Sequence, residues 1–127
     1  MKVLVTESQI KRRVRKLAAE ITAFYDGKPL TFIILMNGGL LFGADLARAV
    51  ELPLRWEAFS CSSYTDDRSS GKLLIRSELK NPIKGRHLLV IDDILDTGFT
   101  LKNIIAHFEQ AGALSVRTCV QIGRAHV

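Results

Sequence analysis

The residues best suited to do chemistry come directly after an apolar run in the second half of the chain. Residues 88–91, LLVI, lead into two adjacent carboxylates, Asp92 and Asp93. Carboxylate oxygens accept hydrogen bonds from hydroxyl groups such as those of ribose, and they also bind Mg²⁺, directly or through its waters. Because adjacent residues of a strand point to opposite faces, both carboxylates meet one ligand only where the strand twists or a loop begins.

A second polar cluster follows at the expected start of a helix. It consists of Asp96, Thr97, Gly98, Phe99 and Thr100. Free backbone N–H groups and the positive end of the helix dipole favour an anion at such a place. The glycine lets the backbone approach a ligand closely, and the two threonine hydroxyls add donors. Carboxylates that can bind sugar hydroxyls lie next to a segment that can bind a phosphate. Together they predict a site for ribose 5-phosphate.

A simpler interpretation is that Asp96 and Thr97 only cap a helix after a turn. An isolated Asp-Thr-Gly would favour that interpretation. The complete order of apolar strand, acidic pair and Asp-Thr-Gly-x-Thr favours the phosphate site instead.

Strands and helices are expected to alternate along the chain and to place these clusters at one edge of a sheet. Apolar residues recur at helical spacing in residues 10–24 and 40–50, and a third helix is expected at 98–110. Short apolar runs predict strands at residues 31–36, 54–61, 87–92 and 115–120, and the polar segment 62–71 is expected to be a mobile surface loop. This alternation predicts an α/β fold with an open, mainly parallel sheet flanked by helices. In such a sheet, ligands bind beyond the carboxyl ends of the strands.

Composition and charge restrict the class of protein. A length of 127 residues suggests one domain, and 47% hydrophobic residues are typical of a soluble globular protein. The net charge of +5 favours anionic partners, and much of it lies in residues 11–16, KRRVRK, which we expect to be a solvated helix face rather than an RNA-contacting patch. Cys61 and Cys119 have no metal-binding spacing, so buried thiols in a reducing cytoplasm are expected. The sequence has neither an apolar run of membrane-spanning length nor a signal-peptide pattern, which also favours a cytoplasmic location.

Residues 88–101, LLVIDDILDTGFTL, resemble the signature of the type I phosphoribosyltransferases. Residues 36–39, MNGG, are similar to the pyrophosphate-contacting loop of the hypoxanthine-guanine branch of that family. Residues 62–64, SSY, and residues 69–71, SSG, resemble its mobile loop. The similarity covers residues 6–120, nearly the whole chain.

The resemblance implies an activity. Enzymes of this branch transfer 5-phosphoribose from phosphoribosyl pyrophosphate to N9 of a 6-oxopurine, hypoxanthine or guanine, in purine salvage, and pyrophosphate leaves. Because the transition state is similar to an oxocarbenium ion, positioning and charge stabilisation should account for most of the catalysis. The resemblance also implies Mg²⁺ as cofactor and a homo-oligomer, either a dimer or a tetramer.

The same resemblance implies a role for each site residue. Asp92 and Asp93 hold the ribose hydroxyls and the hydrated Mg²⁺, and Asp96 lies near purine N7 as general base or acid. Ser63 and Tyr64 close over the reacting centre and exclude water. The residues implied to cradle the 5-phosphate are Thr97, Gly98, Phe99 and Thr100. Those implied to contact pyrophosphate are Asn37, Gly38 and Gly39, and the peptide bond before Asn37 is often cis in this family.

Three matched positions depart from some relatives. Asn37 stands where several carry Lys, which removes a charged link to pyrophosphate. Phe99 stands where many bacterial members carry Leu, but its backbone N–H can still bind phosphate. Asp92 stands where Glu is common, which shortens the reach of that carboxylate by one methylene.

The sequence leaves two other functions open. One is the same reaction with a different base, xanthine or guanine alone. The other is a nucleotide-sensing regulator of the same fold that binds RNA or DNA, and only the basic residues 11–16 favour it. The implied base Asp96 and the pair Ser63 and Tyr64 favour catalysis.

The end of the chain departs from the family pattern after Val120. There the pattern continues with a Lys that reads the purine 6-oxo group, an aromatic residue that stacks on the base, and an Asp for a second Mg²⁺. Residues 121–127, QIGRAHV, have no strand or helix character and match one translation of a common sequencing-library adapter. We expect residues 1–120 to be an incomplete phosphoribosyltransferase core with little activity and residues 121–127 to be a non-native tail. A natural short paralogue is the alternative.

Overall fold

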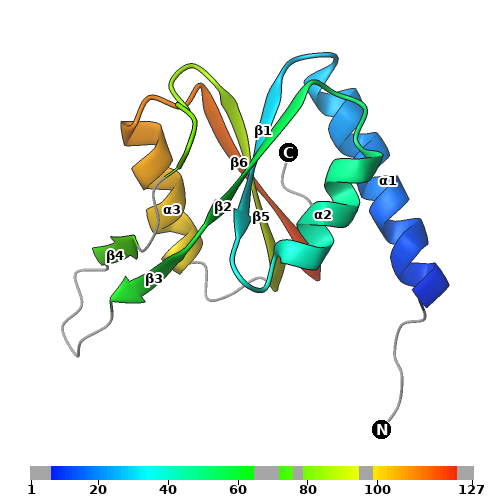
Figure 1. The fold of residues 1–127 in the computed structure, drawn as a ribbon, viewed down its shortest axis with the longest axis horizontal. Coiled ribbons are helices and arrows are strands. Elements are labelled where there is room, and N and C mark those ends of the chain that lie inside the picture. Colours follow the sequence, from blue (N-terminus) through cyan, green and yellow to red (C-terminus); the bar gives the residue numbers. More distant parts are fainter. Residues whose placement is uncertain (1–6, 65–71, 76–78, 95–98, 123–127) are drawn as a thin grey trace, which may run out of the picture.

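A four-stranded parallel sheet forms the centre of the protein. The computed structural model describes residues 7–64, 72–75, 79–94 and 99–122 (Figure 1). The elements in chain order are α1 (Glu7–Tyr25), β1 (Leu30–Leu35), α2 (Leu40–Ala49), β2 (Leu54–Phe59), β3 (Cys61–Tyr64), β4 (Lys72–Ile75), β5 (His87–Ile94), α3 (Phe99–Gln110) and β6 (Ser115–Ile122). The strand order is β2-β1-β5-β6, and β3 pairs with β4 in a separate antiparallel hairpin. The predicted α/β fold with an open, mainly parallel sheet is confirmed.

The sheet is covered on both faces, α1 and α2 lying on one and α3 on the other (Figure 1). Every residue of β1 is buried because successive side chains alternate between the two faces. Phe32 and Ile34 pack with α1 and α2, whereas Ile33 and Leu35 pack with α3. This double burial explains why the strand is a continuous apolar run rather than an alternating one.

Helix α1 is amphipathic, as its apolar spacing predicts. Its buried residues are Val14, Leu17, Ala18, Ile21 and Tyr25. Positive φ angles at Asp26 (47°) and Gly27 (79°) follow directly and end the helix. The basic residues of segment 11–16 are exposed, in agreement with a solvated face.

Three predicted boundaries are wrong. The strand predicted at 54–61 ends at Phe59, and Cys61 begins the separate strand β3. Residues 62–64, predicted as loop, belong to β3, because pairing with β4 supplies backbone partners that local composition does not reveal. Residues 121 and 122, predicted to lack regular structure, extend β6, since β5 continues beside it and pairs Ile94 with Ile122. Residues 65–71 lie outside the described part of the chain.

Within the described ranges, none of the helices is long and apolar enough to cross a membrane.

Phe108 packs on the face of the sheet that α3 covers, and replacing it tests how much that face contributes to stability. It is 1% exposed on α3, and its ring lies 5.0 Å from that of Phe59. We expect Phe108→Ala to lower the free energy of unfolding by about 3–5 kcal/mol, because it removes a large buried side chain and leaves a cavity. Urea denaturation measures this. Leu114→Ala, at a residue 63% exposed, is the control and should change stability by less than about 0.5 kcal/mol.

Candidate functional site

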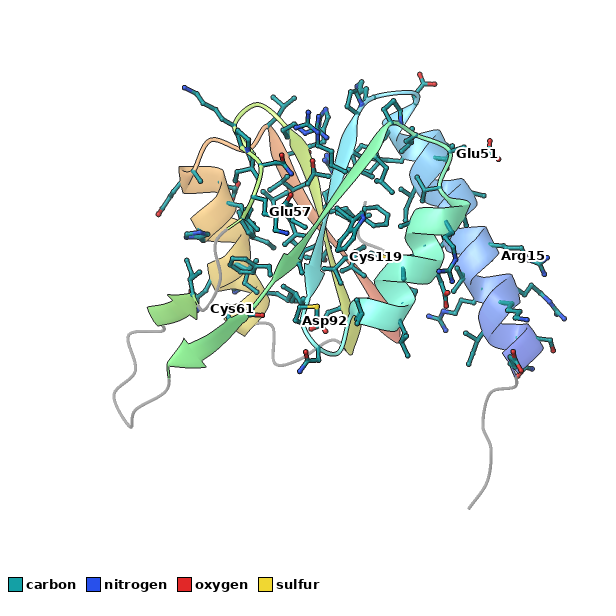
Figure 2. The ribbon with its side chains drawn as sticks, in the orientation of Figure 1. Arg15, Glu51, Glu57, Cys61, Asp92 and Cys119 are labelled. Atoms are coloured by element: carbon teal, nitrogen blue, oxygen red, sulfur yellow. The ribbon has the colours of Figure 1, made fainter. Side chains whose placement is uncertain are left out.

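The loop after β1 and the end of β5 lie at the same edge of the sheet. The two strands are parallel neighbours, with Ile34 opposite Ile91. Their carboxyl ends therefore meet, and the β3–β4 hairpin leaves from the end of β2 at that edge. Figure 2 shows Asp92 at the lower edge of the sheet, near the start of α2, and Cys61 on the side of β3.

Gly39 is the point of closest contact between the loop and β5. A Cβ at this position would lie 2.6 Å from the carbonyl oxygen of Ile91, 2.9 Å from that of Leu35 and 3.3 Å from the Cα of Asp92. Backbone atoms cannot give way as a flexible side chain can, so the packing requires glycine. The loop is thereby held directly against the residue that carries the predicted carboxylate.

The same loop leads into the N-terminus of α2. The N–H of Gly39 donates to the carbonyl of Leu35 (2.8 Å), and its own carbonyl accepts from Gly43 (2.7 Å). Gly39 is the N-cap of α2, and no side chain caps the helix. The N–H groups in the first turn of a helix lack intrahelical partners, so this end of α2 is suited to an anion.

The residue before the loop connects β1 to β2. The N–H of Met36 donates to the carbonyl of Phe59 at 3.1 Å. The peptide bond between Met36 and Asn37 is cis, as the resemblance implied.

Asp92 influences the thiol of Cys61. Burial raises the pKa of Cys61, and the negative charge of Asp92 raises it further. Both side chains are half-buried at the strand ends. Sequence reasoning did not assign Cys61 to the site, although its position directly before residues 62–64 was a signal for it.

Cys119 differs from Cys61. It is fully buried under α1, and burial raises the pKa of its thiol to about 12. The expectation of a buried thiol is therefore confirmed for Cys119 and wrong for Cys61.

The structure brings together four of the predicted site residues, namely Asn37, Gly38, Gly39 and Asp92. Asp93 follows in β5, and Phe99 and Thr100 open α3. Ser63 and Tyr64 are part of β3. Asp96, Thr97 and Gly98 lie outside the described residues.

Two of the histidines and the tryptophan also carry side chains that could do chemistry. His87 is at the opposite edge, where its Nδ1 lies 2.7 Å from the Ser115 hydroxyl. Burial lowers its pKa, and the charges of Lys28, Arg117 and Arg86 lower it further. His107 stacks on Phe59, with ring centroids 6.3 Å apart. Trp56 is 58% exposed, so it is not a core residue.

Within the described ranges, no group of three or more His, Cys, Asp or Glu side chains is arranged to hold a metal ion. The half-buried carboxylate of Asp92 at a strand end still fits Mg²⁺ bound mainly by substrate oxygens and water, because Mg²⁺ usually needs only one or two protein carboxylates.

Comparison with known proteins agrees with this arrangement. The family described as "Phosphoribosyl transferase domain" matches residues 3–126. The hypoxanthine-guanine-xanthine phosphoribosyltransferase of Tritrichomonas foetus is 36% identical over 118 residues, which are 93% of this chain and 64% of that protein. The hypoxanthine-guanine phosphoribosyltransferase of Aquifex aeolicus is 38% identical over 122 residues, covering 94% of this chain and 68% of that protein.

A solved structure gives the same result in three dimensions. The hypoxanthine phosphoribosyltransferase of Staphylococcus aureus superposes with a TM-score of 0.87 and 32% sequence identity, over 94% of this chain and 65% of that one. The chain belongs to the phosphoribosyltransferase family, in the branch of the hypoxanthine-guanine enzymes. It spans about two thirds of the length of these relatives.

The contact at Gly39 is tested by adding one methyl group. Gly39→Ala pushes against backbone carbonyls, so we expect it to lower the free energy of unfolding by about 1–3 kcal/mol and to displace the amide resonances of Ile91 and Asp92 in NMR spectra.

Gly43→Ala is the matched control. Its added Cβ would lie 2.8 Å from the Cδ1 of Ile34, and its three nearest atoms all belong to that side chain rather than to Asp92. It should shift resonances around Ile34 and leave that of Asp92 in place. Equal shifts of Asp92 in both variants would contradict the assigned contact.

The pairing of Asp92 and Cys61 is tested by alkylation. Removing the carboxylate charge in Asp92→Asn should lower the pKa of Cys61, raise the thiolate fraction at pH 8 and speed its reaction with iodoacetamide by about twofold or more. Mass spectrometry of the modified peptide gives the rate. Cys119 should remain unmodified in the folded protein.

The control for this experiment is Glu20→Gln, because Glu20 acts on Cys119 and not on Cys61. An unchanged or slower reaction of Cys61 in Asp92→Asn would refute the electrostatic coupling.

Proposed function

We propose that the protein transfers 5-phosphoribose from phosphoribosyl pyrophosphate to N9 of hypoxanthine or guanine. The C1′–oxygen bond to pyrophosphate breaks, the N9–C1′ bond forms, and pyrophosphate leaves with the electron pair. The observation that carries the proposal is the contact of Gly39 with the end of β5. It sets the loop proposed for pyrophosphate directly beside Asp92. The ribose and the pyrophosphate, which the reaction separates, would therefore be held by adjoining segments.

Asp92 and Asp93 are proposed to bind the ribose hydroxyls, for which acidic oxygens at a strand end are suited. They would also hold Mg²⁺ through its waters, and the ion would neutralise the charge that develops on pyrophosphate. The N-terminus of α2 and the backbone of Asn37, Gly38 and Gly39 would receive the pyrophosphate, with Asn37 supplying no cation of its own.

The start of α3 is proposed as the phosphate site. Phe99 and Thr100 open this helix, and Thr97 and Gly98 directly precede it in the sequence. The positive end of a helix dipole favours an anion. These residues would cradle the 5-phosphate. Asp96, just before them, is proposed to take up or return a proton at purine N7 as N9 attacks C1′.

The β3–β4 hairpin is proposed to exclude water from the reacting centre. It carries Ser63 and Tyr64 and begins at Cys61, within the electrostatic influence of Asp92. An oxocarbenium-like transition state is easily captured by water, so closure of such an element protects the reaction.

The base preference is proposed to be hypoxanthine or guanine, in agreement with the names of the relatives. Each reported relative is a transferase, so a nucleic-acid-binding regulator receives no support from them. A homo-oligomer remains part of the proposal, as does a role in purine salvage.

Calorimetric titration with phosphoribosyl pyrophosphate and Mg²⁺ tests the site. We expect binding to the chain, and an affinity about tenfold or more weaker in the double variant Asp92→Asn/Asp93→Asn, because it loses charged acceptors for the hydroxyls and the hydrated ion. Chromatographic detection of the nucleoside monophosphates from hypoxanthine and guanine tests the reaction. Product should form more slowly in the double variant than in the unchanged chain.

Asp45→Asn is the control, since Asp45 lies on α2 and pairs with Arg48. It should bind phosphoribosyl pyrophosphate as the unchanged chain does. Absence of binding in the unchanged chain, or equal affinity in the double variant, would overturn the proposal.

A further inference from the structure

Glu57 is a buried carboxylate outside the proposed site. It lies on β2, is 5% exposed, and shares the α3 face of the sheet with Phe59. Both of its oxygens accept hydrogen bonds. Oε1 accepts from the backbone N–H of Lys80 at 2.7 Å, and Oε2 accepts from the side-chain amide of Asn81 at 2.6 Å.

These hydrogen bonds join two segments that are far apart along the chain. Strand β2 runs toward the site, and the chain then leaves the sheet to form the β3–β4 hairpin. Residues 79–81 bring it back before β5 begins. Glu57 thus contacts the returning segment, 23 and 24 residues later in the sequence, close to where the outgoing strand departs. Figure 2 shows Glu57 on β2, above the hairpin.

A carboxylate is a costly choice for this position. Burial of a charge is unfavourable unless hydrogen bonds compensate for it, and an apolar side chain would suit the neighbouring core of Ile33 and Phe59. Hydrogen bonds to a charged acceptor are shorter and stronger than those between neutral groups. A charged acceptor with two donors therefore fixes the returning segment more firmly than apolar contact would.

The main sheet does not hold the hairpin by strand pairing. In the described part of the chain, β3 pairs with β4 alone. The position of the hairpin beside the site therefore depends on its two stems and on packing of β4 against α3.

We propose that Glu57 is a positioning residue that clasps the two stems of the β3–β4 hairpin and so holds the start of β3 beside Asp92. The role in positioning β3 follows from the hydrogen bonds alone. Its consequence for the transfer reaction rests on the proposed function.

The test exchanges donor and acceptor between positions 57 and 81. Asn81→Asp sets a carboxylate against that of Glu57 and should break the clasp. Glu57→Gln/Asn81→Asp restores it, because the amide introduced at position 57 accepts from Lys80 through its oxygen and donates its N–H to the carboxylate introduced at position 81. Glu57→Gln alone should have a small effect, since the Asn81 amide can rotate to present its oxygen.

Hydrogen exchange of backbone amides reports on the clasp without any ligand. In Asn81→Asp, amides of β3 and β4 should exchange about tenfold or more faster, while those of β1 and β5 keep their protection. The double variant should return the hairpin to within about threefold of the original rates. Glu51→Gln, at an exposed glutamate before β2, is the control and should change neither set.

Equal acceleration of exchange in the hairpin and in the central strands would show that Glu57 only stabilises the whole fold, and would overturn the inference. Unchanged exchange in Asn81→Asp would also overturn it. So would a double variant whose hairpin amides still exchange as fast as those of Asn81→Asp. Should Asn81→Asp not fold, Asn81→Ala, which removes one donor without adding charge, provides the same comparison. Nucleoside monophosphate formation is measured on the same variants. If exchange becomes faster in the hairpin alone but no variant, nor the unchanged chain, forms product, the role of Glu57 in positioning the hairpin stands and the proposed reaction is rejected.

Discussion

The parallel pairing of β1 with β5 is the constraint on which the site depends. It brings the ends of two strands, separated by more than fifty residues of sequence, to one edge of the sheet. Gly39 then lets the loop after β1 lie against the backbone of Ile91 and Asp92. Any side chain at position 39 would separate the proposed pyrophosphate loop from the proposed ribose carboxylate. The chemistry thus requires both a strand order that the core fixes and one residue without a Cβ.

The core fixes that order through burial on both faces. β1 and β5 are the two inner strands, and their side chains supply both hydrophobic clusters. A shift in register by one residue would exchange the two faces of β1 and place Phe32 on the side that now accommodates Ile33. Since both faces are closely packed, the register is strongly determined, and with it the relative height of Asn37 and Asp92. The packing that stabilises the sheet therefore also sets the geometry of the site.

The sequence predicts the buried strands of the sheet better than the β3–β4 hairpin outside it. Continuous apolar runs such as 31–36 identify strands covered on both faces, and the order of Asp92, Asp93 and the Asp-Thr-Gly-x-Thr segment predicts a site that remains a proposal. The β3–β4 hairpin was not predicted, because its pairing joins Tyr64 to Lys72 across a polar segment with no periodicity. The contact of Gly39 with Ile91 was not predictable either, since it is a tertiary contact between the loop after β1 and strand β5. Cys61 was expected to be buried, and only the tertiary structure places it half-buried near Asp92.

The three named relatives differ in the bases that their names include, hypoxanthine alone, hypoxanthine with guanine, and all of these with xanthine. They nevertheless match this chain at similar identity, from 32% to 38%, over nearly the same share of it. A span that determined the base would be expected to separate them. The described strands carry the residues proposed to hold the sugar phosphate and the leaving pyrophosphate, which the proposed reaction needs whatever the base. Under that proposal, this scaffold positions the bond that is broken and does not by itself select the base.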